Sequence, residues 1–177
     1  MKQVLRTSGL AAAIVIVAML KTAAAQSAPI QAEMLKDWSD LKTTMTKIAN
    51  EMPDDKYSFK PTPAQQSYGE RILDVAQANV GFLKTLGGQA AAPTIDAKGT
   101  TKQAAMKALT DSFDYGIALL KEQTDQTMLQ TVKAPYIGPS SRARVYTFLI
   151  GHTWDIYGQM AVYLRLNGKV PPASQRP

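Results

Sequence analysis

The chain contains no cysteine and only one histidine, His152, among its 177 residues. Without cysteine it cannot form a disulfide, a thiolate metal site, a cysteine nucleophile or a lipid-modified N-terminal cysteine. No stretch shows the alternation of apolar and polar residues that is typical of half-buried strands. No Ser or Thr motif marks a nucleophile either. The sequence therefore points away from sheet folds and from triad-type hydrolases.

Long hydrophobic runs are also scarce. The one candidate is Leu10–Leu20, whose eleven residues fall short of the about 20 that span a bilayer. Lys2 and Arg6 precede this run and three alanines follow it at 23–25, which is the pattern of a secretory signal peptide. We predict that residues 1–25 are removed near Ala25 and that the protein is exported, to the periplasm or the medium. Only an uncleaved signal segment would attach it to a membrane.

A strong excess of charge of one sign is absent from the predicted mature chain. Lys2, Arg6 and Lys21 leave with the signal segment and no acidic residue does, so 17 basic and 14 acidic residues remain. The net charge then falls from +6 to +3, and the basic residues do not cluster as they do in nucleic-acid-binding proteins. Residues 26–177 number 152, the size of one domain, and we predict a single domain there.

Four segments carry apolar residues at the three- and four-residue spacings of an amphipathic helix. The predicted helices cover about residues 29–50, 67–86, 101–123 and 141–167. Residues 51–66 form a connection rich in proline, and residues 123–139 are expected to be a loop. Trp38 lies at the centre of the first apolar stripe and is expected to be buried. The pattern predicts an all-α four-helix bundle with an up-down layout and a long second connection.

The ends of these helices carry recognisable signals. Pro29 suits the first turn of a helix, and Gly87 with the following glycine suits a C-terminal stop. Ser140 or Ser141 can cap the fourth helix. The apolar face predicted for that helix comprises Val145, Phe148, Leu149, His152, Ile156, Tyr163 and Leu166.

Three motifs resemble one known family, the DinB-like (DinB/YfiT-like) four-helix bundles. Residues 52–63 (MPDDKYSFKPTP) resemble the family's connection after the first helix, and residues 71–79 (RILDVAQAN) resemble its second-helix motif. Residues 152–172 (HTWDIYGQMAVYLRLNGKVPP) give the strongest resemblance, to the pattern HxxxHyGqlvvYLRlnGxvPP. The similarity covers most of the mature chain and implies the same fold.

The resemblance also implies where a metal would bind. Family members typically hold a divalent metal with one histidine from the second helix and two from the fourth. These positions fall on Asp74, His152 and Ile156. Asp74 can ligate through oxygen but Ile156 cannot ligate, so the expected triad is degenerate. A buried, hydrogen-bonded imidazole is the alternative role for His152, and a solvated surface position is the alternative for Asp74.

Two further side chains are candidate auxiliary ligands. Glu70 lies one turn before Asp74 and would add a second carboxylate on the same helix face. Gln159 lies two turns after His152 and could contribute a carbonyl, although a hydrogen-bonded amide is the simpler expectation. The expected cofactor is therefore none, or a weakly bound divalent metal such as zinc or nickel.

Two functions of different classes follow, and the sequence leaves open whether the protein is an enzyme. The first is an exported, metal-degenerate bundle that binds a small molecule or forms homodimers. The second is a divalent-metal-dependent transferase or hydrolase with an altered site built on Asp74 and His152. Some family members are similar to thiol S-transferases, but their thiols are cytosolic, so the predicted export argues against that activity.

Overall fold

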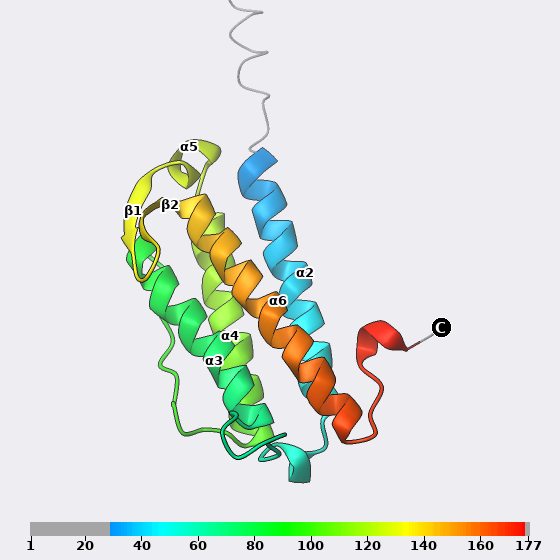
Figure 1. The fold of residues 1–177 in the computed structure, drawn as a ribbon. Coiled ribbons are helices and arrows are strands. Elements are labelled where there is room, and N and C mark those ends of the chain that lie inside the picture. The colour runs from blue at the N-terminus through cyan, green and yellow to red at the C-terminus, as the bar shows by residue number, and fades with distance from the viewer. Residues whose placement is uncertain (1–28, 176–177) are drawn as a thin grey trace, which may run out of the picture.

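The computed structural model describes residues 29–175, and the predicted signal peptide at residues 1–25 lies outside them. Four long helices make up most of this part of the chain: α2 (Pro29–Glu51), α3 (Tyr68–Leu83), α4 (Lys102–Lys121) and α6 (Arg142–Leu166). They lie side by side as a bundle (Figure 1). Each is close to its predicted position, so the all-α four-helix bundle is confirmed. None of the helices in residues 29–175 combines the length and apolar character that a membrane span requires.

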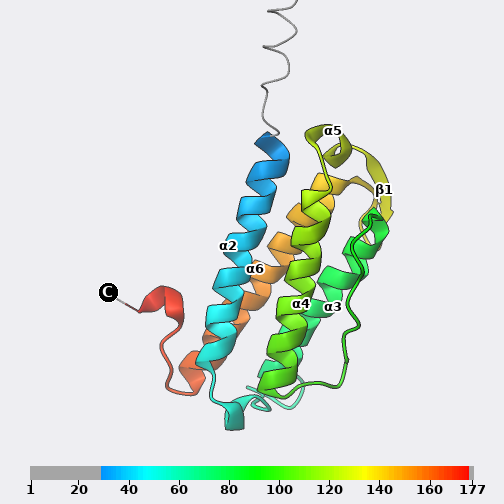
Figure 2. The same cartoon turned by 180° about the vertical axis from the view of Figure 1, so that it is seen from behind.

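The up-down layout that we predicted is wrong, because the helix directions do not alternate along the chain. After α3 and the short 3-10 helix η2 (Lys84–Leu86), residues 87–101 run back along the outside of the bundle (Figure 2). As a result α3 and α4 run parallel to each other, and so do α2 and α6 (Figures 1 and 2). The long second connection was predicted. Because it returns the chain to the end of the bundle where α3 begins, α3 and α4 run in the same direction.

Helix starts and stops follow the predicted chemistry. Pro29 begins α2, and the Ser141 side chain accepts a hydrogen bond from the Arg144 backbone N–H at the start of α6. Ser67 and Glu70 form a reciprocal capping box at the start of α3, which satisfies two backbone donors at once. Gly87 has φ +68°, the left-handed conformation that glycine adopts at little cost.

Trp38 occupies the centre of the core, as predicted. Its side chain is fully buried, and its Nε1 donates a 3.0 Å hydrogen bond to the Phe113 carbonyl of α4. The Phe113 and Tyr146 rings pack against the indole with centroid distances of 4.9 and 5.1 Å. One aromatic cluster thus joins α2, α4 and α6.

The segment after α4 is not the loop that we predicted. It contains the one-turn helix α5 (Asp125–Met128) and an antiparallel hairpin of β1 (Thr131–Ala134) and β2 (Gly138–Ser141). The strands are only four residues long, too short for alternation to be visible in the sequence. The hairpin contacts η2 and the start of α6, and the Arg142 guanidinium donates to the Leu86 carbonyl.

Two residues of the predicted buried face of α6 are exposed. Phe148 is 39% exposed and Leu166 is 59% exposed. Leu166 is the last residue of the helix, where the bundle no longer covers it. Phe148 lines a pocket, together with the half-buried His152.

Candidate functional site

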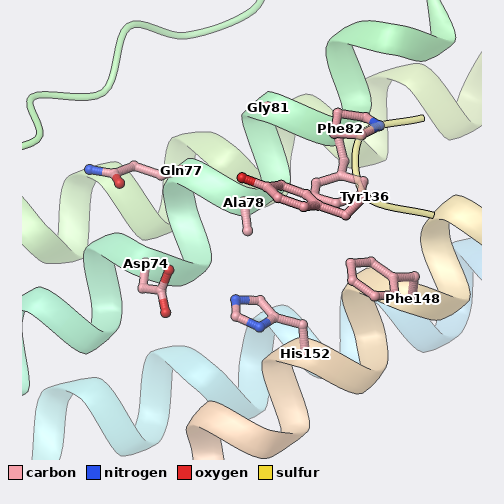
Figure 3. A pocket seen from close by; sticks show the side chains of 9 residues that line it. Asp74, Gln77, Ala78, Gly81, Phe82, Tyr136, Phe148 and His152 are labelled. Atoms are coloured by element: carbon pink, nitrogen blue, oxygen red, sulfur yellow. The ribbon is translucent and has the colours of Figure 1, made fainter. Parts of the chain in front are cut away.

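A pocket opens between α3, α6 and the tip of the hairpin (Figure 3). Its volume is about 420 Å³, within the range of small-molecule sites. The lining residues are Asp74, Gln77, Ala78, Gly81, Phe82, Pro135, Tyr136, Phe148 and His152. The pocket therefore brings together Asp74 and His152, the two metal-ligand candidates that can ligate.

Helical spacing places the two sides of the pocket. On α3, Asp74, Ala78 and Phe82 follow one another at intervals of four residues, and side chains at this interval share a helix face. On α6, Phe148 and His152 have the same interval. The capping box at Ser67 fixes where α3 begins and hence which of its residues face α6.

Two polar side chains of the pocket, Asp74 and His152, have no side-chain partners in the part of the chain that the structure describes. The Asp74 carboxylate forms no hydrogen bond or ion pair within residues 29–175, and the residue is half-buried. The Nε2 atom of His152 is buried and has no hydrogen-bond partner in the same part of the chain. Figure 3 shows both side chains pointing into the space between α3 and α6. Buried polar atoms normally have partners, so the lack of one at His152 Nε2 sets this end of the pocket apart from its apolar walls.

Aromatic rings form the other end of the pocket. The Phe82 and Phe148 rings lie 5.0 Å apart at 32°, and the Phe82 and Tyr136 rings lie 6.2 Å apart at 28°. Tyr136 is at the hairpin tip and is 97% exposed, so it forms the outer wall, with its ring across the pocket (Figure 3). One end of the site is thus apolar and the other carries a carboxylate and an imidazole.

A family model described as the DinB family matches residues 19–177. The chain belongs to the DinB family. The search of proteins with curated functions found no match.

Solved structures of DinB-like proteins share the fold. A crystal structure of a DinB-like protein from Bacillus cereus ATCC 10987 has a TM-score of 0.68 at 20% identity, covering 78% of this chain and 93% of that one. The DinB-like protein YjoA of Bacillus subtilis has a TM-score of 0.61 at 16% identity, covering 81% and 99%. YfiT of Bacillus subtilis, described as a probable metal-dependent hydrolase with an unusual four-helix bundle topology, has a TM-score of 0.56 at 13% identity, covering 78% and 88%.

The donor set of this DinB-family chain does not fit a family-type metal triad. Ile156, at the third position that the resemblance assigned, is 2% exposed and packs in the hydrophobic core. Within residues 29–175 no three His, Cys, Asp or Glu side chains lie close enough together to hold a metal ion. A catalytic zinc takes three protein ligands, and here only Asp74 and His152 are in place.

The auxiliary ligand candidates lie outside this pocket. The Glu70 carboxylate accepts from the Ser67 backbone N–H and pairs with Lys60 at 3.2 Å. The Ser67 hydrogen bond, followed by the nearby Lys60 charge, lowers the pKa of Glu70. The Gln159 amide nitrogen donates to the Asp155 carboxylate at 2.9 Å. Neither side chain lines the pocket.

Sequence reasoning missed the aromatic wall. Phe82 lies eight residues after Asp74, so its place on the same face of α3 could have been found from helical spacing. Phe148 lies four residues before His152 and was assigned to the core instead. Tyr136 carried no signal, because its position depends on a hairpin that the sequence did not reveal.

Proposed function

We propose that the protein is an exported DinB-family domain that binds a small organic molecule in the pocket between α3, α6 and the hairpin, without a catalytic metal. The observation that carries this proposal is the make-up of the pocket. Within residues 29–175 the Asp74 carboxylate and His152 Nε2 lack partners at one end, and three neighbouring aromatic rings form the other end. Mostly apolar walls with a few convergent polar groups are typical of small-molecule sites.

The position of Ile156 supports a function that does not need a metal. The Ile156 side chain is buried in the core. An aliphatic group therefore occupies the position at which the family resemblance predicts a histidine ligand. Asp74 and His152 alone would compensate only part of the charge of a divalent ion. An organic ligand needs only the hydrogen bonds and apolar contacts that the pocket already offers.

Screening a small-molecule fragment library by ligand-detected NMR tests the proposal. Gly81→Leu should abolish binding, because Gly81 lines the pocket and a Cβ at this position meets open space, so the larger side chain can enter without a clash. Gly151→Leu is the matched control, since Gly151 is also helical with open space around it but lies outside the pocket. If no fragment bound, or if both variants bound equally well, the proposal would be wrong.

A metal-dependent transferase or hydrolase is the second candidate. Two observations favour it: Asp74 and His152 share one pocket, and YfiT, a structural neighbour, is described as a probable metal-dependent hydrolase. Isothermal titration with zinc and nickel separates the two proposals. Tight stoichiometric binding that His152→Ala abolishes would favour the enzyme.

A further inference from the structure

The charge of the pocket has one sign. Asp74 is the only Asp, Glu, Lys or Arg side chain that lines it, and no cation within residues 29–175 pairs with its carboxylate. An unpaired carboxylate in a recess with apolar walls gives the site a negative potential, because the walls confine the field and screen it less than water does. A ligand carrying positive charge is therefore favoured, and an anion is repelled.

The aromatic end of the pocket favours an apolar group. Phe82 is flanked by Phe148 and Tyr136, with interplanar angles of 32° and 28°, so the rings form a nearly continuous apolar wall. A quaternary or protonated amine attached to an apolar body would satisfy both the carboxylate and this wall.

The backbone at Tyr136 indicates that its ring belongs to the site. Tyr136 has φ +58° and is the one non-glycine residue with positive φ in the described chain. The left-handed conformation is unfavourable for a bulky side chain. With 97% of the side chain exposed, packing in the core does not account for a tyrosine here. The ring stacks on Phe82 and forms the outer wall of the pocket.

We infer that the pocket takes a small organic cation, with its ammonium group near Asp74 and its apolar body along the wall of Phe82, Phe148 and Tyr136. The unpartnered His152 Nε2 can form one hydrogen bond with a polar group of the same ligand. This inference rests on the proposed function, because it names the class of molecule that the proposed binding site selects.

Three probes of similar shape and different charge test the inference. Benzyltrimethylammonium is a permanent cation, neopentylbenzene is its neutral isostere, and phenylmethanesulfonate is an anion of similar size. Each is titrated into the protein while the backbone amide NMR signals of α3 and α6 are followed. We expect the cation to bind about tenfold more tightly than the neutral probe, as an unpaired carboxylate in an apolar recess allows, and the anion not to bind.

Two variants with the same change in net charge separate a local contact from a general charge effect. Asp74→Asn should reduce the affinity for the cation to that for the neutral probe and leave the neutral probe unchanged. Asp37→Asn should change neither affinity, because Asp37 is an exposed residue of α2 outside the pocket. Tyr136→Ala should weaken both the cationic and the neutral probe.

The outcomes distinguish this inference from the function on which it rests. Equal binding of the cation and its neutral isostere, with no effect of Asp74→Asn, would overturn the cation preference and leave the small-molecule site standing. Preferential binding of the sulfonate would do the same. Absence of binding by every probe and every library fragment would overturn both.

Discussion

The indole ring of Trp38 lies directly against the backbone of Gly116. A Cβ placed on Gly116 would come within 2.6 Å of Trp38 Nε1 and within 2.8 Å of two ring carbons. The indole cannot move aside, because its Nε1 is bonded to the Phe113 carbonyl and Tyr146 packs on its ring. The Tyr146 hydroxyl in turn donates to the Gly116 carbonyl at 2.9 Å. The close approach of α2 and α4 therefore depends on a glycine at this position.

Gly116→Ala should lower the free energy of unfolding by about 1–3 kcal/mol, the usual cost of overpacking a core. Gly158→Ala is the control, because a Cβ there has nothing within 4 Å and alanine favours the helix by roughly 0.5–1 kcal/mol. Urea denaturation of both variants measures the difference. Equal stabilities would mean that α2 and α4 are farther apart than described.

Trp38→Ala should cost about 3–5 kcal/mol of stability, as large-to-alanine substitutions of buried aromatic residues do. The substitution removes the fully buried indole and leaves the Phe113 carbonyl without its donor. Trp38→Phe keeps an aromatic ring and should lose less. A loss below about 1 kcal/mol for Trp38→Ala would contradict the placement of Trp38 in the core.

Calorimetric titration with zinc or nickel should give weak or undetectable binding to the wild type. Ile156→His should raise the affinity by orders of magnitude, because it restores the third ligand beside His152 and Asp74. Adding His152→Ala to that variant should remove the gain. A gain that survived His152→Ala would show that the ion binds elsewhere, and no gain would show that Asp74 is not placed to ligate.

Tyr136→Gly should separate ligand binding from stability. Glycine relieves the left-handed backbone but adds entropy to the unfolded chain, so the free energy of unfolding should change by less than about 1 kcal/mol. Affinity for a ligand bound along the aromatic wall should fall. Thermal unfolding and probe titration measure the two quantities, and a large loss of stability would indicate that Tyr136 has a structural role instead.

Glu70→Gln should alter how stability depends on pH. The folded protein lowers the pKa of Glu70, so the carboxylate contributes stability above its ordinary pKa of about 4.3 and loses that contribution as the pH falls through the folded value. Glutamine keeps a capping acceptor but cannot titrate. Denaturation curves at several pH values should show that the stability advantage of the wild type over Glu70→Gln disappears on acidification. A difference in stability that does not change with pH would contradict this role of the Glu70 charge.

The helices were predictable because their signals are local. Apolar periodicity, Pro29, Ser141 and Gly87 each act within one or two turns, and the structure follows them closely. The hairpin was missed because its four-residue strands pair with each other and contact η2 and α6, and no local pattern in the sequence reveals these contacts. Asp74 and His152 were predicted to share a site from the family resemblance, not from their spacing in the sequence. The aromatic wall at Tyr136 could be found only from the tertiary structure.

The walls of the pocket differ in how closely they are connected to the hydrophobic core. The walls from α3 and α6 belong to helices whose opposite faces form the core, so most changes there also affect folding. The third wall consists of two residues, Pro135 and Tyr136, at the tip of a short hairpin on the surface. In the proposed binding site, substitution or insertion at that tip would change which molecules are accepted while the bundle stays intact. Selectivity for the proposed ligand could thus evolve almost independently of folding.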